Sequence, residues 1–190
     1  TVLGIIKQAV DSWAKEYTHR TLCTTTYQLF IDTVYDMDRK VSEGMYVAPD
    51  MELNRRAINL PFSPVSSISH VKYYDDDNNA TVYATSNYFL DDASEPSRFT
   101  LTTGASYPGG LRPTNSLEIQ YVAGYGGASA VPNQIKQACL IYASHLFEQR
   151  GDTDKNVSAP STATRLLQPF VIREFSTNIF RGRVHYGGLI

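Results

Sequence analysis

The segment Leu117-Glu118-Ile119-Gln120-Tyr121-Val122 decides the fold class, because its apolar residues alternate with polar ones. Such alternation is typical of a strand with one buried face. The segment continues into the glycine-rich turn Ala123-Gly124-Tyr125-Gly126-Gly127, and Pro132 then opens a helix predicted over 132–150. Proline is tolerated in the first turn of a helix because its missing N–H would have no partner there. The stretch therefore predicts a strand, a turn and a helix in direct succession.

Two further helices are predicted on either side of this stretch. Apolar residues recur every three to four positions from Val2 to Tyr17, which predicts a helix over 1–18. A short helix is predicted over 163–172, although Pro169 interrupts it. The large side chains that we expect in the packed faces of the first two helices are Trp13, Tyr17, Tyr142 and Leu146.

The region between the first two helices, 21–122, has the chemistry of short strands. Residues 58–65 carry prolines at a spacing that disfavours a helix and suits an extended edge segment. Residues 33–56 are less patterned and predict a loop or an extra hairpin. The predicted strands are Thr21–Asp32, Ser67–Tyr74, Thr81–Tyr83, Tyr88–Leu90, Arg98–Leu101 and Leu117–Val122. The fold class is therefore α+β, with helices flanking an inserted antiparallel β-sheet and an extended C-terminal tail.

Composition indicates a globular chain and argues against several functions. Of the 190 residues, 42% are hydrophobic and 19% charged, which is typical of a chain that folds. The net charge of -2 argues against a protein that wraps nucleic acid, because such a protein needs a basic face. No apolar run approaches the roughly 20 residues that span a bilayer, so we expect no membrane role. The 13 tyrosines suit half-buried sheets and subunit contacts.

No pattern in the sequence predicts catalysis, a metal site or a cofactor. The four histidines, at 19, 70, 145 and 185, lie in separate segments without metal-ligand spacing. Cys23 and Cys139 lack any paired Cys or His motif and predict two buried free thiols. Ser106 follows Gly104 but has Pro108 where a nucleophile elbow needs glycine. We therefore expect a protein that is not an enzyme.

The acidic run at 75–77 resembles the start of a calcium-binding loop but does not match the rest of the loop pattern. Asp75, Asp77 and Asn79 match the first three ligand positions, but Ala80 stands where the loop needs glycine and Ser86 where it needs glutamate. The segment instead predicts a polar turn between two strands that end at Tyr74 and begin near residue 81.

The C-terminal tail, 173–190, has no period and mixes large apolar residues with arginines. From residue 165 onward there are four Arg and one Glu, a balance of +3, whereas residues 72–98 hold six acids and two bases, a balance of -4. An apolar, basic tail on an acidic body favours docking onto a partner. The alternative is a tail that folds back on its own domain.

Several ordered segments carry a resemblance to a known family. They are Tyr17-Thr18-His19-Arg20, the Leu-Pro-x-x-Pro-Val-x-Ser-Ile pattern at 60–68, the Ala-Gly-Tyr-Gly strand end at 117–126, and the helix segments 131–138 and 148–151. Over residues 2–172 the chain resembles the phage head–tail connector (adaptor) family, which includes the HK97-type connector and its longer prophage and gene-transfer-agent relatives. It departs from the family pattern by starting at the second of the usual helices and by its longer tail.

The resemblance implies a virion protein of the neck, synthesised in the cytoplasm of the bacterial host. Such connectors form a ring, usually a dodecamer, beneath the portal and line the channel used in DNA packaging and ejection, without sequence-specific DNA binding. The implied partners are the portal, a stopper or other tail proteins, and further copies of the chain. Residues 1–172 would form the connector domain, with its helices, including Trp13, Tyr17, Tyr142 and Leu146, packed around the ring. The tail would dock on the portal through Phe175, Ile179, Phe180, Arg181, Arg183 and Tyr186.

Two other functions stay open at this point. One is a neck stopper or tail-completion protein, although such proteins tend to be mostly β. The other is a β-rich module that binds carbohydrate or a receptor, which the tyrosine content permits. Mass measurement with and without the portal separates these functions from the connector.

Overall fold

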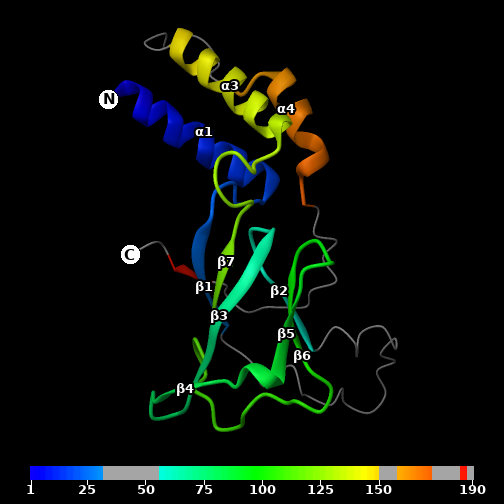
Figure 1. The fold of residues 1–190 in the computed structure, drawn as a ribbon. Helices are drawn as coiled ribbons and strands as arrows, with labels where there is room; N and C mark the ends of the chain where they lie inside the picture. Colours follow the sequence, from blue (N-terminus) through cyan, green and yellow to red (C-terminus); the bar gives the residue numbers. More distant parts are fainter. Residues whose placement is uncertain (32–55, 150–157, 173–184, 188–190) are drawn as a thin grey trace, which may run out of the picture. The chain divides into compact units, whose positions relative to one another are not determined.

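The computed structural model describes residues 1–31, 56–149, 158–172 and 185–187. The chain forms two compact units (Figure 1). The helical unit comprises residues 1–24 and 124–174, and the β unit comprises residues 25–123 and 175–190. Helices precede and follow an inserted set of antiparallel strands, which confirms the predicted α+β class.

The helical unit contains the helices expected from the apolar spacing. Its elements are α1 (Val2–Thr18), α3 (Asn133–Glu148), α4 (Ser161–Leu167) and the 3-10 turn η3 (Gln168–Phe170). Pro169 lies inside η3, which explains why the last helix changes character there. The buried residues at its centre are Ala14, Leu22, Val131, Ile135, Ala138, Ala163 and Leu167.

The end of α1 is tied to the end of the last helical segment. The hydroxyl of Thr18 donates a hydrogen bond of 2.6 Å to the carbonyl of Ala14. His19 then takes a left-handed conformation, with φ 54°, as the C-cap. The Nε of Arg20 donates to the carbonyl of Phe170 over 2.6 Å, and the N–H of Ile172 donates to the carbonyl of Thr18. The Tyr-Thr-His-Arg segment thus ends one helix and holds a distant one.

Gly124 is required by the geometry of the turn between β7 (Leu117–Ala123) and α3. Its φ is +122°, which L side chains rarely adopt, and a Cβ there would lie 2.6 Å from the carbonyl oxygen of Cys23. Backbone hydrogen bonds from Tyr125 to Leu22 and from Thr24 to Gly126 bring the two chain segments this close. The glycine therefore permits the contact between the segments.

The β unit consists of two antiparallel sheets. The first has the order β4-β3-β7-β1-β8 and the second the order β2-β6-β5. The first sheet is built from β1 (Thr25–Ile31), β3 (Val65–Tyr74), β4 (Ala80–Val82), β7 (Leu117–Ala123) and β8 (His185–Gly187). The second is built from β2 (Ala57–Asn59), β5 (Tyr88–Asp91) and β6 (Arg98–Leu101), with the 3-10 turn η2 (Thr85–Asn87) before β5.

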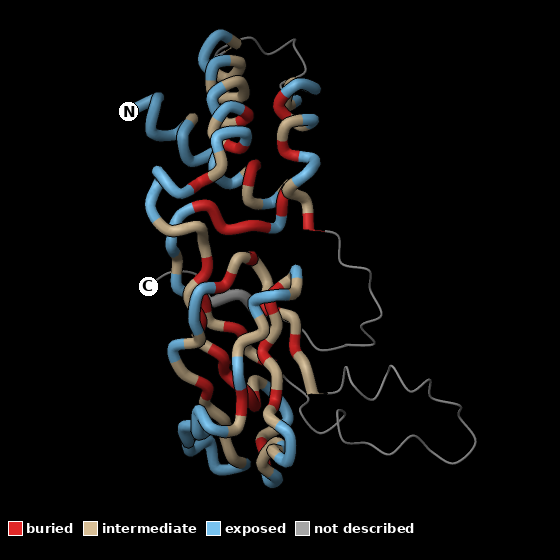
Figure 2. Tube along the Cα trace, turned by 45° about the vertical axis from the view of Figure 1, so that its right-hand side comes forward, coloured by how far each residue is buried: buried red, intermediate tan, exposed pale blue. Residues whose placement is uncertain are grey.

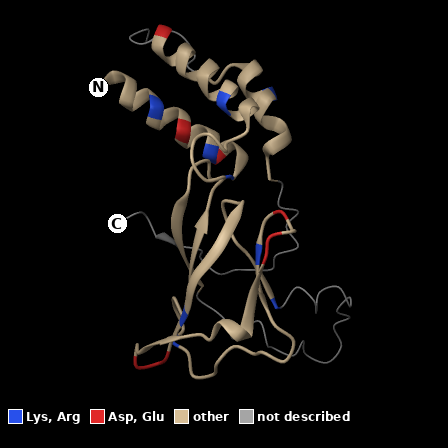
Figure 3. Cartoon of the chain, viewed as in Figure 1, with Lys and Arg blue, Asp and Glu red and all other residues tan. Residues whose placement is uncertain are grey.

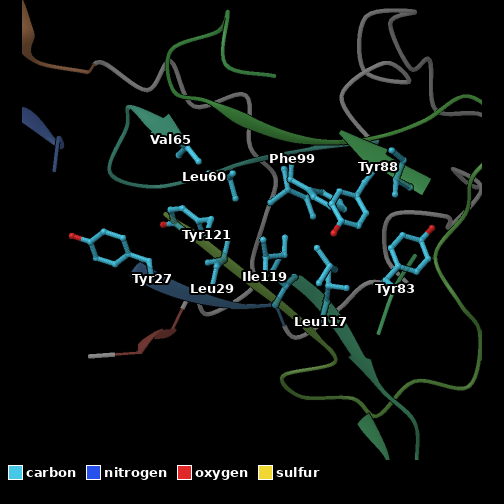
Figure 4. Close-up of a cluster of buried hydrophobic side chains, with 14 of the residues drawn as sticks. Tyr27, Leu29, Leu60, Val65, Tyr83, Tyr88, Phe99, Leu117, Ile119 and Tyr121 are labelled. Carbon is cyan, nitrogen blue, oxygen red and sulfur yellow. The ribbon is translucent and has the colours of Figure 1, made fainter. Parts of the chain in front are cut away.

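Strand β7 lies at the centre of the larger sheet and confirms the alternation that defines it in the sequence. Leu117, Ile119 and Tyr121 are at most 1% exposed, and β1 pairs with β7 in register from Thr25 opposite Ala123 onward. Their side chains lie in one cluster with those of the second sheet, around Phe99 (Figure 4). Aromatic contacts extend this core, with the tilted rings of Tyr88 and Phe99 5.1 Å apart between centroids. Both sheets therefore share one core.

Strand β3 departs from simple alternation. Its core contacts, Ile68, Val71 and Tyr73, are spaced by three residues and then by two. The register of the pairing with β7 shifts between Val65 and Ser67 and again between Ile68 and His70, as it does where a β-bulge adds a residue to one strand. The extra residue returns Val71 to the buried face, where it is fully covered, while Ile68 and Tyr73 pack partly buried against the cluster.

The segment with the two prolines runs from an edge strand to an inner one. Strand β2 forms an edge of the smaller sheet, and residues 60–64 connect it to β3. Pro61 and Pro64 lie in this connection and not in β2, so the extended edge segment expected over residues 58–65 is found only at its beginning. The predicted loop or hairpin at 33–56 lies outside the described residues, apart from Arg56.

Candidate interaction surfaces

Buried residues concentrate inside each unit, and the exposed ones lie around them (Figure 2). In the described part of the chain, no three His, Cys, Asp or Glu side chains come together in a way that could hold a metal ion. His19 caps α1, His70 lies in β3, His145 lies in α3, and the backbone of His185 lies in β8. The sites that remain are surfaces and polar clusters.

The acidic run forms the turn between β3 and β4, as the sequence predicts (Figure 3). The carboxylate of Asp75 accepts hydrogen bonds from the N–H of Asp77 and of Asn79, and from the side-chain amide of Asn79. The hydrogen bonds from Asn79 lower the pKa of Asp75. The carboxylate therefore serves the turn itself.

Glu118 is a buried carboxylate that the sequence does not single out. It lies on the face of β7 opposite the core, yet it is only 4% exposed. The hydroxyl of Tyr74 donates to its Oε2, while Nε2 of His70 lies 3.1 Å and Nε2 of Gln28 3.4 Å from its Oε1. Three side chains from the two neighbouring strands thus cover and satisfy one carboxylate.

The pKa of Glu118 is set by opposing effects. Burial alone raises it, but the hydrogen bonds from Tyr74 and His70 and the charge of Lys72 outweigh burial, so the pKa lies below its ordinary value. The same hydrogen bond raises the pKa of the Tyr74 hydroxyl. The guanidinium of Arg112 covers the other side of Tyr74, with its Cζ 3.9 Å from the ring centroid. This arrangement braces the central strands and holds Glu118 ionised.

The helical unit has an aromatic cluster where the sequence predicts packed faces. The ring of Trp13 lies 4.7 Å from that of Tyr142 and 6.0 Å from that of Tyr17, measured between centroids. All three residues pack partly buried against the helical core. Leu146 is half-buried. Their further role around a ring stays a proposal.

The two cysteines, both in described segments, do not pair in a disulfide. Burial, together with the charge of Asp11, raises the pKa of the Cys139 thiol to about 11. Cys23 is exposed, because it precedes β1 instead of lying in it. The expectation of two buried thiols is therefore wrong for Cys23.

Exposed apolar residues gather on two helices. Among the described residues, five of the seven large apolar side chains that are exposed lie in α1 and α3. They are Val2, Leu3, Ile5, Leu140 and Phe147. The sequence places Val2 and Ile5 in one apolar stripe with the core residues of α1, but the stripe is wider than the single face that α1 buries. The unusual width of the apolar stripe in the sequence is therefore the feature that could have predicted this exposed surface.

The predicted docking tail is described only at its end. The backbone of Tyr186 lies in β8, which pairs antiparallel with β1 from Gln28 to Phe30. The other five predicted docking residues, Phe175, Ile179, Phe180, Arg181 and Arg183, lie outside the described residues. No helix in the described segments has the length and apolar character needed to cross a bilayer.

No protein-family model matches the sequence, and no curated protein matches it. Solved structures do match the fold. A chain in the neck of a native gene transfer agent particle, computed with C12 symmetry, is 21% identical with a TM-score of 0.67, over 94% of this chain and 86% of that one.

Two further solved structures give the same result. In the neck of an empty gene transfer agent particle, computed with C6 symmetry, a chain is 21% identical with a TM-score of 0.67, over 93% of this chain and 81% of its own length. In the virion of the native gene transfer agent particle, a chain is 18% identical with a TM-score of 0.68, over 93% of this chain and 80% of that one. Nearly the whole chain therefore has the fold of a chain found in the neck of gene transfer agent particles.

Proposed function

We propose that this chain is a structural subunit of the neck of a tailed-phage-like particle, and specifically a head–tail connector that forms a ring beneath the portal. The observation that carries the proposal is the fold likeness over 94% of the chain to a chain in a particle neck. Fold alone does not determine function, so the proposal also draws on the ordered sequence segments of the connector family. DNA passes through such a ring without being gripped, which suits a net charge of -2.

The segments that resemble the connector family have structural reasons in this fold. The Ala-Gly-Tyr-Gly sequence ends β7 and includes Gly124, whose positive φ and close approach to Cys23 exclude other residues. The Leu-Pro-Phe-Ser-Pro-Val sequence leads from the edge strand β2 to β3. The Tyr-Thr-His-Arg sequence ends α1 and holds η3 through Arg20. These reasons favour a shared architecture over a chance match of short motifs.

Native mass spectrometry of the purified protein, alone and mixed with the portal protein of the same particle, tests the proposal. We expect either a closed ring of identical subunits or a complex in which many copies assemble on one portal. A protein that stays monomeric in both samples contradicts the proposal. Binding to the tail side of a preformed neck but not to the portal would favour the stopper, and thermal stabilisation by a sugar would favour the carbohydrate-binding module.

The C-terminal tail is part of the proposal as the segment that docks on the portal. Its support is the mixture of apolar and basic residues at 175–186 on a body with acidic turns (Figure 3). Deleting the tail would also remove β8 from its sheet, so substitutions give the cleaner test. The double variant Arg181→Glu, Arg183→Glu should weaken portal binding strongly, and the effect should diminish with added salt.

Arg165→Glu provides the matched control for the tail variant, because Arg165 is an exposed arginine on α4 outside the tail. Portal binding by this control should stay near that of the unmodified protein in a pull-down or by mass photometry. Equal portal binding by the tail variant and the control would refute docking through these arginines, while leaving the ring itself unaffected.

A further inference from the structure

The amino-terminal half of α1 carries an apolar seam that the described residues leave exposed. Val2, Ile5 and Ala9 follow the spacing i, i+3, i+7, which places them on one face of the helix. Val2 is 54% and Ile5 69% exposed, and Ala9 is exposed as well. The buried face of the same helix includes Val10 and Ala14, so this seam is the part of the apolar stripe that lies beside the buried face and stays exposed. We call Val2, Ile5 and Ala9 the α1 seam.

Helix α3 carries a second seam with the same spacing. Leu140, Ala143 and Phe147 stand at i, i+3, i+7, and we call them the α3 seam. Leu140 is 65% and Phe147 39% exposed. The inward residues of α3, Ile135 and Ala138, are fully buried, so this seam lies on the outer side of the helix. Each helix therefore buries one face within the unit and presents another to the outside.

The two seams suit each other as partners. Side chains at i, i+3, i+7 form a ridge that can interdigitate with a ridge on another helix, and each seam has an alanine that lets another helix approach closely. Single apolar residues on a surface need no explanation, but two matched rows of them indicate contact surfaces. A closed ring requires two different surfaces on every subunit, one for each neighbour. The helical unit has two such surfaces.

We propose that the α1 seam of one copy packs against the α3 seam of the next copy, so that these two helix faces form the subunit contact of the assembly. The occupant of each seam is thus a second copy of this chain. This inference rests on the proposed function, because it assigns the ring contact to particular residues. Chains of the same fold occur in necks computed with C12 and C6 symmetry, which is the setting in which such a repeated contact would arise.

The test uses one charge in each seam. Ile5→Glu disables the α1 seam and Leu140→Glu disables the α3 seam, and each variant should weaken association by about tenfold to a hundredfold per contact. Gln8→Glu and Gln134→Glu introduce the same charge at exposed positions of α1 and α3 outside the seams and should leave assembly unchanged. Far-UV circular dichroism should show unchanged helix content in all four variants, because every substituted side chain is exposed.

Mixing the two seam variants gives the decisive result. Each variant retains the seam that the other lacks, so an equimolar mixture should form one contact per pair and stop at a 1:1 dimer, whereas each variant alone stays monomeric. Mass tags on one variant identify this dimer by native mass spectrometry, at a protein concentration close to that at which the unmodified chain assembles.

The outcomes separate this inference from the proposed function. If the unmodified protein assembles, alone or on the portal, and the seam variants assemble equally well, the seam contact is overturned while the connector stands. Where the unmodified protein assembles by itself, a mixture of the two variants that stays monomeric also overturns the seam contact. If the unmodified protein never assembles, the connector itself fails and the seam contact fails with it.

Discussion

The β unit and the helical unit differ in where their large apolar side chains lie. In the β unit, two sheets enclose one cluster that includes Leu60, Phe99 and Leu117, all fully buried. The helical unit has a smaller cluster and leaves Ile5 and Leu140 more than half exposed. Burial of apolar surface is the main stabilising term in folding, so the β unit holds more of that stabilisation within itself.

This difference indicates a division of roles. A unit that encloses most of its large apolar side chains gains less from a neighbour than a unit with exposed apolar seams does. The connector proposal follows the same division, because it assigns subunit contacts to the helices. Trp13 is the single tryptophan of the chain and lies in the helical unit, so its fluorescence reports on that unit alone. Unfolding of the helical unit can therefore be followed separately from unfolding of the β unit.

The largest effect should come from opening the core of the β unit. Phe99→Ala removes a fully buried ring between the sheets and should lower the free energy of unfolding by about 3–5 kcal/mol. Urea unfolding followed by far-UV circular dichroism measures this loss, and the transition of Trp13 should move less. Phe89→Ala is the matched control, because Phe89 is 49% exposed on β5 and its loss should cost about 0.5 kcal/mol or less. Equal losses in the two variants would contradict the proposed core.

A second large effect should follow from Gly124→Ala, which lies in the helical unit. The added Cβ would clash with the backbone of Cys23 and the φ of +122° would be strained, so we expect a loss of about 2–4 kcal/mol. Thermal unfolding observed through Trp13 fluorescence measures it. Gly127→Ala has open space around its Cβ and no positive φ, so it should stay close to the unmodified protein. A tolerated alanine at 124 would mean that the turn is not held as described.

Glu118→Gln should produce a moderate effect that depends on pH. At pH 7 the loss of the ionised acceptor should cost about 1–3 kcal/mol, since three donors face this carboxylate. The pKa of Glu118 is lowered in the folded protein, so its contribution is complete above the ordinary pKa of a glutamate. That contribution is lost as the pH falls through the lowered folded pKa. The difference in stability between the protein and the variant should therefore vanish toward low pH.

Denaturant titrations across pH 2–8 give this profile, and Glu16→Gln on the exposed side of α1 serves as its control. The control should show no comparable loss at pH 7. A constant difference between Glu118→Gln and the unmodified protein at every pH would show that the carboxylate acts through shape and not through charge.

The smallest expected effect is a gain in the free energy of unfolding. His19 is a left-handed C-cap with φ 54°, a conformation that glycine adopts without a Cβ penalty. His19→Gly should raise the free energy of unfolding by about 0.5–1 kcal/mol, offset in part by the greater freedom of glycine in the unfolded chain. His19→Ala keeps the Cβ and should show no gain. A stabilising alanine would locate the benefit in the loss of the imidazole instead of the backbone.

The sequence predicted helices and strands well wherever the apolar residues recur with a single period. The helix at 1–18 and the strand at 98–101 follow from apolar spacing, because a helix or strand with one buried face repeats its pattern locally. Strand β3 shows the limit, since the bulge after Ile68 depends on its pairing with β7. Glu118 shows the same limit, because a glutamate in an alternating strand reads as solvent-facing until the neighbouring strands supply Gln28, His70 and Tyr74.

The sequence by itself determined the α+β class, the order of helices and strands, and the acidic turn, because each depends on residues close together in the chain. Only the tertiary structure decided that the strands divide into two sheets around one core, since pairing and packing join distant segments. The width of the apolar stripe on α1 was visible in the sequence. Which part of it the protein buries, and which part remains as a seam, depended on where α3 packs.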